Sequence, residues 1–299
     1  MSADTLIWFG TLGVPARRRH ELSAKAWTCL GLLAIPLWAT WPALALRALQ
    51  VPAFECLTIA FVAGWLVLRR LETAPPLRAG SGSWLPALAC ALGLTGSNAF
   101  HILATHYIPA AEANLLSYLW PVESIGIGAL LRVFRLEARH LCGLALGIAG
   151  AFALMAHGGL ALSLTGIALA LASGLSWALY CVFRLVRNDS PARLLQRACL
   201  ISALLCLALH AALESTVVPD LGALASSAAI GIVPLALGNL AWDRGFRRGD
   251  SRLLTVMAYA TPLCSALLLV ALGLESLTLA LGIGAALIVL AGWLSRAKT

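Results

Sequence analysis

Long apolar stretches separated by short polar connections run through most of the chain. Ten of them approach or reach the roughly 20 residues that a helix needs to cross a bilayer. They cover residues 26–46, 51–68, 84–105, 110–131, 141–156, 164–183, 194–213, 223–242, 253–272 and 277–294. The stretches show none of the apolar–polar alternation of membrane β-strands. The pattern therefore predicts an all-α integral membrane protein with ten transmembrane helices.

Basic residues occupy every second connection between these stretches. Of the 21 Lys and Arg residues, only Arg47 lies on the other side. Because basic residues are retained on the cytoplasmic side during insertion, this distribution predicts that both termini are cytoplasmic. Arg outnumbers Lys 19 to 2, which hints at a GC-rich bacterial genome. We therefore expect the inner (cytoplasmic) membrane of a bacterial cell.

The chain also looks duplicated. Three residues recur at an offset of 141 positions: Asn98, Tyr118 and Pro121 as Asn239, Tyr259 and Pro262. Both sets fall in the third and fourth spans of successive five-span halves, and an odd number of spans inserts the second half upside down. This predicts a cytoplasmic tail at 1–25, a first repeat at 26–158 and a second, inverted repeat with a short tail at 159–299. Inverted repeats are typical of secondary transporters that bind substrate near mid-membrane.

Two segments, 112–121 (EANLLSYLWP) and 275–284 (ESLTLALGIG), make the chain resemble the drug/metabolite transporter superfamily with its paired EamA repeats. Within that superfamily, residues 97–107 (SNAFHILATHY) followed by 118–121 (YLWP) resemble the YddG-type exporters of aromatic amino acids. The resemblance implies a carrier that exports aromatic or other large neutral amino acids. Transport would proceed by alternating access through a central cavity between the two repeats.

Polar side chains gather on one face of the third predicted helix. Asn98, His101 and Thr105 are three and four residues apart, which places them on the same side of a helix. Because polar groups inside a bilayer tend to face a wet cavity or the bundle interior, we expect Ser97, Asn98 and His101 to bind a zwitterion. Asn239 is the matching candidate in the second half. The alternative is that Asn98 and His101 only hydrogen-bond to neighbouring helices.

Flat aromatic side chains offer a second kind of contact. Tyr118 and Trp120 lie just before Pro121, and a proline frees backbone groups by removing a helix hydrogen bond. Because both aromatics are near mid-span, we expect them to line the cavity and to stack on a planar ring of the cargo. Trp177, in the sixth predicted helix, and Trp38, in the first, are further candidates. The alternative for all four is ordinary packing.

Carboxylates and prolines within the spans suggest further roles. Glu123 lies two residues past Pro121 and is a candidate for proton coupling, unless a polar neighbour satisfies it. Asp243 lies among the arginines that follow the eighth span, so we expect it in the charged rim at the cytoplasmic end. Pro36, Pro121 and Pro262 are candidate points of flexing.

Composition excludes several other classes. The chain is 61% hydrophobic with a mean hydropathy of +0.89, and its net charge of +8 lies at helix ends instead of on a nucleic-acid-binding face. None of the eight cysteines forms a Cys-x-x-Cys pair, so we expect no metal site and no cofactor. The motifs of membrane-embedded lipid-modifying enzymes are missing as well. A carrier of another small metabolite or drug stays open, and so does the oligomeric state.

Overall fold

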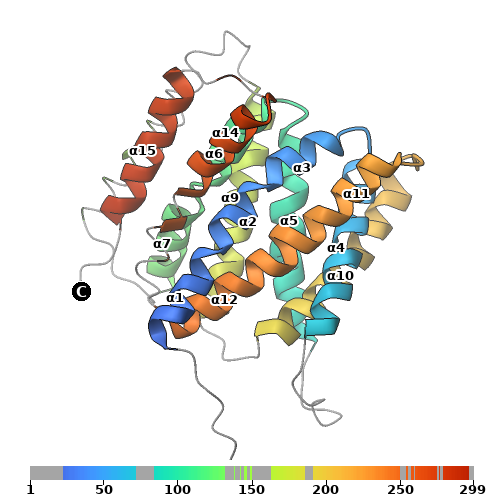
Figure 1. The fold of residues 1–299 in the computed structure, drawn as a ribbon, viewed down its shortest axis with the longest axis horizontal. Coiled ribbons are helices and arrows are strands. Elements are labelled where there is room, and N and C mark those ends of the chain that lie inside the picture. Colours follow the sequence, from blue (N-terminus) through green and yellow to red (C-terminus); the bar gives the residue numbers. More distant parts are fainter. Residues whose placement is uncertain are drawn as a thin grey trace, which may run out of the picture.

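The computed structural model describes residues 23–71, 84–131, 163–185, 191–249, 260–274 and 279–295, with isolated positions between 138 and 149 and between 254 and 276. Every regular element in these residues is a helix, and the helices form one bundle (Figure 1). They are α1 (Ala24–Leu32), α2 (Ala34–Ala39), α3 (Trp41–Arg47), α4 (Ala53–Leu71), α5 (Leu85–Ala104), α6 (Ala110–Ser117), α7 (Trp120–Leu130), α9 (Leu164–Leu185), α10 (Pro191–Leu213), α11 (Leu221–Ile230), the π-helix η1 (Gly231–Gly238), α12 (Asn239–Arg248), α14 (Ala260–Ala271) and α15 (Leu279–Ser295).

Five helical segments among the described residues are long and apolar enough to cross a membrane. They are Ala24–Arg47, Leu85–Ala104, Leu164–Arg184, Ala192–Leu213 and Leu221–Arg248. These segments match the first, third, sixth, seventh and eighth predicted spans. Most of the fifth predicted span and the tail up to residue 22 lie outside the described residues.

Three of the predicted spans are interrupted. The first breaks between Leu32 and Ala34, because Pro36 has no N–H to bond to the carbonyl of residue 32. The fourth breaks between Ser117 and Trp120, next to Pro121 in the first turn of α7. Both breaks lie next to prolines that the sequence marks as candidate points of flexing, and that role stays a prediction. The eighth span contains a wide π-helical segment, η1, which the sequence had not led us to expect and which holds Pro234.

Glycines let two pairs of helices cross closely. α4 meets η1 where Gly231 lies against Ala60, and a Cβ on Gly231 would overlap the Ala60 carbonyl oxygen. α1 meets α12 where Gly245 lies against Gly31, and a Cβ on Gly245 would come within 2.9 Å of the Trp27 carbonyl oxygen. Small residues permit this close approach of main chains in membrane bundles.

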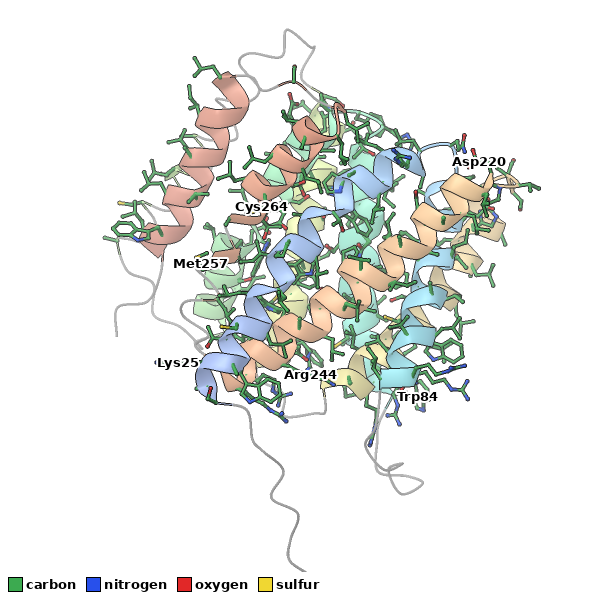
Figure 2. All side chains as sticks on the ribbon, viewed as in Figure 1. Lys25, Trp84, Asp220, Arg244, Met257 and Cys264 are labelled. Atoms are coloured by element: carbon green, nitrogen blue, oxygen red, sulfur yellow. The ribbon has the colours of Figure 1, made fainter. Side chains whose placement is uncertain are left out.

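The two ends of the bundle differ in charge. Lys25, Trp84 and Arg244 lie at one end, which we call the basic end, and Asp220 lies at the opposite end (Figure 2). Three arginines cover indole rings, with Arg248, Arg69 and Arg197 at 4.7, 5.5 and 4.9 Å from the ring centroids of Trp27, Trp65 and Trp84. Such cation–π pairs combine the basic residues and the interfacial aromatic residues that favour one membrane surface.

Carboxylates complete helix termini at the opposite end. Glu214 accepts the backbone N–H of Glu55 at 3.2 Å in the first turn of α4, where negative charge is favourable. Asp220 accepts the backbone N–H of Ala223 at 2.7 Å at the start of α11 and the Gln50 amide at 2.6 Å. These two hydrogen bonds hold the pKa of the Asp220 carboxyl below its usual range.

Candidate functional site

One cavity lies among the interrupted helices. All eight residues that the sequence predicted for substrate binding line it: Trp38, Ser97, Asn98, His101, Tyr118, Trp120, Trp177 and Asn239. The rest of the lining is Trp41, Asn114, Ser117, Ser173, Gly174, Pro234 and Leu235. The α2–α3 junction, the α6–α7 junction and η1 all contribute to this wall. The break next to Pro121 and the wide turns of η1, which hold Pro234, therefore lie at the cavity, as expected where irregular backbone borders a wet space.

Asn239 offers the cavity a hydrogen-bond donor. The Trp38 indole N–H donates to Asn239 Oδ1 at 2.9 Å. Because an indole N–H can only donate, this bond fixes the orientation of the amide and identifies Nδ2 as its remaining polar atom. Nδ2 is buried and has no hydrogen-bond partner among the described residues. An unpartnered amide N–H at a cavity wall suits a carboxylate oxygen.

His101 offers the cavity an acceptor. Its Nδ1 lies 3.3 Å from Ser117 Oγ, and the single Ser117 hydroxyl proton is shared between the carbonyls of Ala113 and Ala170, at 2.8 and 3.2 Å. With the serine proton on a carbonyl, the neutral tautomer that satisfies the contact with Ser117 is the one protonated at Nδ1, and we assign it here; it leaves a lone pair on Nε2. Nε2 is buried without a partner among the described residues. Such an atom suits the N–H groups of an ammonium.

Two further groups fix the polar side of the cavity. Asn98 Nδ2 donates to the Leu94 carbonyl at 2.7 Å, so the amide oxygen is its second polar atom. The Ser173 hydroxyl donates to the Ser97 carbonyl at 2.8 Å and so joins α9 to α5. The polar wall is therefore shared between a helix of the first half and a helix of the second half.

Indole rings form the apolar side of the cavity. Trp177 makes edge-on contacts with Trp38 and Trp120, with ring centroids 5.8 and 6.2 Å apart and interplanar angles of 83° and 87°. Trp242 contacts the same two rings at 5.0 and 6.4 Å, although it does not line the cavity. Flat faces of this kind suit a planar aromatic ring.

Glu123 lies beside the cavity and is not part of its lining. Its Oε2 has no hydrogen-bond partner among the described residues, and it lies against Gly174, which does line the cavity. A Cβ on Gly174 would be 2.8 Å from Glu123 Oε2 and 2.7 Å from the Ser117 carbonyl oxygen. Any side chain at position 174 would therefore displace either the Glu123 carboxylate or the Ser117 carbonyl, and only glycine fits there.

Asp243, which the sequence assigns to the charged rim, is buried in an ion pair at the basic end. Its carboxylate pairs with the Arg184 guanidinium, and the two side chains are only 12% and 6% exposed. A charged side chain can be buried when an opposite charge compensates it, and each member of this pair compensates the other. The pair joins α9 to α12 at the basic end, away from the cavity lining.

Comparison with known proteins places this helical bundle in a family. The model of the EamA-like transporter family matches the chain twice, over residues 25–156 and 164–296. The chain belongs to the EamA-like transporter family. The protein named Aromatic amino acid exporter YddG from Ancylobacter novellus is 32% identical over 278 residues, which cover 90% of this chain and 96% of that protein. A solved crystal structure aligns with a TM-score of 0.74 at 31% identity, and covers 91% of this chain and 96% of its own.

Membership of the EamA-like transporter family confirms two predictions from the sequence. The protein is a multi-pass membrane transporter of the drug/metabolite type and not an enzyme, and it contains two EamA repeats. The resemblance to YddG-type exporters is confirmed by the similarity to the Ancylobacter protein. Tyr259, the expected counterpart of Tyr118, lies outside the described residues.

Several lining residues of this EamA-family cavity were missed in the sequence. Asn114 and Ser117 lie four and one residues before Tyr118, and Trp41 lies three residues after Trp38. Helical spacing around the residues already singled out could have found them. Pro234 and Leu235 gave no such signal, because they reach the cavity only through the wide turns of η1.

Proposed function

We propose that this EamA-family protein exports aromatic or other large neutral amino acids by alternating access through the central cavity. The observation that carries the proposal is the pairing of an unpartnered donor and an unpartnered acceptor with four indole rings in one cavity. A zwitterion with a planar side chain matches both sets of groups. The similarity to a protein named as an aromatic amino acid exporter supports the same cargo.

The cargo binds in a defined orientation in this proposal. Its carboxylate accepts from Asn239 Nδ2, and its ammonium donates to His101 Nε2. The planar side chain lies against Trp120 and Trp177, with Tyr118 and Trp38 beside it, and Ser97 and Asn98 complete the polar wall. Because the two polar anchors come from different repeats, the bound cargo bridges both halves. A ligand that bridges them can favour one arrangement of the halves over the other.

The same proposal covers the arrangement in the membrane. Ten helices form two inverted repeats, at 26–158 and 159–299, with both termini in the cytoplasm of a bacterial cell and the protein in its inner membrane. The two family matches and the basic end, which we assign to the cytoplasmic side, support this topology.

Uptake of labelled phenylalanine into proteoliposomes tests the function. We expect saturable uptake that unlabelled tryptophan blocks. Uptake that is neither saturable nor blocked would contradict an amino-acid carrier. A series of competitors with other chemistry, such as polyamines or nucleotide sugars, would then identify the cargo class.

Glu123 is the proposed proton-coupling residue, and an imposed pH gradient tests it. Because its Oε2, which has no hydrogen-bond partner among the described residues, lies directly behind Gly174, it can exchange a proton with the cavity when the site is open. We expect a pH gradient to stimulate uptake by the wild type, and Glu123→Gln to transport without any such stimulation. Equal stimulation of both proteins would exclude a coupling role.

Variants of the two polar anchors should separate the ends of the zwitterion. Asn239→Asp keeps an oxygen for the Trp38 indole but places an anionic oxygen where the donor was. We expect the Kd for phenylalanine to rise at least about tenfold, because the hydrogen bond to a charged group is lost. Phenylethylamine, which lacks the carboxylate, should bind Asn239→Asp at least as tightly as the wild type.

His101→Ala removes the proposed acceptor for the ammonium and should not discriminate between the two ligands. It should weaken phenylalanine and phenylethylamine alike, because both carry the ammonium. Competition against labelled phenylalanine measures both Kd values. An unchanged Kd for either ligand in His101→Ala would show that His101 does not bind the ammonium and only packs against neighbouring helices.

A further inference from the structure

We propose that a ring of four tryptophans and the buried Arg184–Asp243 pair form the gate that closes the cavity at the basic end. The gate opens when two helix pairs, α1 with α12 and α7 with α9, move apart. The inference concerns how the transporter closes, and it does not depend on which cargo the cavity binds.

The four indoles contact one another in a closed circuit. The sequence of contacts is Trp38–Trp177, Trp177–Trp120, Trp120–Trp242 and Trp242–Trp38, with centroids 5.8, 6.2, 6.4 and 5.0 Å apart. Three of these residues line the cavity and Trp242 does not. The tryptophan ring therefore lies at the boundary of the cavity, with Trp242 on its far side. Leu254 and Ala258 pack in the same apolar cluster.

The ion pair forms a second layer beyond the tryptophan ring. Arg184 lies seven residues after Trp177, which is two turns further along the same face of α9. Asp243 directly follows Trp242 in α12. Both charged side chains are buried. Arg244, the residue after Asp243, lies at the basic end (Figure 2), so we place the pair on that side of the tryptophan ring.

The helices around the gate are joined in two close pairs. α1 packs on α12 through the Gly31–Gly245 contact, and α7 packs along α9, where Glu123 lies against Gly174. Figure 1 shows α1 and α12 side by side at the basic end of the bundle. Close packing at these glycines holds each pair together as a unit.

The contacts of the gate divide according to these pairs. Trp38 lies on α2, which continues α1, so its contact with Trp242 stays within the first pair, and Trp120–Trp177 stays within the second. Trp38–Trp177, Trp120–Trp242 and Arg184–Asp243 connect one pair to the other. Separation of the pairs thus breaks these three contacts and leaves the Gly31–Gly245 crossing intact.

These connecting contacts suit a reversible closure. The two aromatic contacts that connect the pairs are edge-on, with interplanar angles of 83° and 88°. Unlike stacked rings, such rings can separate and meet again without one sliding between two others. The attraction within a buried ion pair is offset in part by its loss of hydration, so the two side chains can separate when water reaches them. The pair therefore fixes the geometry of the closed state and regains water when the gate opens.

Distances between spin labels on the two helix pairs test the gate. The labels replace Lys25, exposed at the start of α1, and Leu130, 84% exposed at the end of α7. The four cysteines that are not buried, Cys29, Cys142, Cys181 and Cys264, are first replaced by alanine. Pulsed electron paramagnetic resonance then gives the distance distribution of the whole protein in nanodiscs. No cargo is needed, so this result is independent of the proposed cargo.

We expect one main distance in the otherwise unmodified protein. Trp242→Ala removes a connecting contact and should raise the ratio of a longer-distance population to the main one by up to about tenfold. Arg184→Gln with Asp243→Asn, which keeps the volume of the pair, should shift the distribution in the same direction. Trp293→Ala, at a tryptophan that is 46% exposed and outside the ring, is the control and should leave the distribution unchanged.

The proposal is overturned if the distribution of Trp242→Ala matches that of the unmodified protein, or if Trp293→Ala shifts it equally. If Trp242→Ala does not give a single folded species on size exclusion, the double variant Arg184→Gln with Asp243→Asn replaces it in the test. The proposal is then overturned if the distance distribution of the double variant matches that of the unmodified protein.

Discussion

Replacing Gly231 by alanine should cost about 3 kcal/mol or more in folding free energy. A Cβ on Gly231 would overlap the Ala60 carbonyl oxygen and lie 2.6 Å from the carbon of that carbonyl. The obstacle is main chain, which cannot rotate away as a flexible side chain could. α4 and η1 would have to separate, and η1 brings Pro234 and Leu235 to the cavity. Loss of stability should therefore be accompanied by loss of cargo binding.

Thermal unfolding in detergent measures the effect. Gly126→Ala is the matched control, because Gly126 also lies within a helix but a Cβ there would meet nothing within 4 Å. Alanine at that position should be neutral or slightly stabilising, since glycine loses more backbone freedom on folding. Equal melting temperatures for Gly231→Ala and the wild type would show that the crossing is looser than the structure indicates.

Trp120→Ala should raise the Kd for phenylalanine by about thirtyfold, as expected for the loss of a central aromatic anchor. Trp120 lines the cavity and is itself braced edge-on by Trp177 and Trp242, so its ring face is held in place for the cargo. Trp120→Phe retains an aromatic face and should lose less affinity. Equilibrium binding of labelled phenylalanine is the measurement, because rates would also report on the gate.

Two controls separate stacking on the cargo from other roles of the ring. Trp242→Ala changes the same tryptophan ring without changing the cavity lining, so its Kd should stay within about threefold of the wild type. Trp293→Ala should leave the Kd unchanged. Wild-type affinity in a folded Trp120→Ala protein would remove Trp120 from the proposed binding site.

Much of the cavity was predictable because its residues are conspicuous against their local sequence. Asn98 and His101 are polar groups in an apolar stretch, and Tyr118 and Trp120 adjoin a proline that interrupts a helix. Each of these signals needs only a few neighbouring residues to interpret. All four residues line the cavity, and the breaks near Pro36 and Pro121 fall where the chain was expected to bend.

Other features depend on residues that lie far apart in the chain. Trp38 and Asn239, which share a hydrogen bond, are 201 positions apart, and Arg184 and Asp243 are 59 apart. From its neighbours alone Asp243 looks like one more charge at a helix end, and its burial follows only from the approach of α9 to α12. For the same reason the donor and acceptor left free on Asn239 and His101 could not be identified from the sequence.

The sequence by itself determined the helical class, the positions of the apolar stretches, the duplicated family pattern and most of the residues at the cavity. Hydropathy, charge and proline act on the segment that contains them, so they can be interpreted locally. The tertiary structure alone decided which hydrogen-bonding atoms stay free, how four indoles close into a ring, and where main chains cross at Gly231 and Gly245. These features arise from the packing of distant helices, which no single segment encodes.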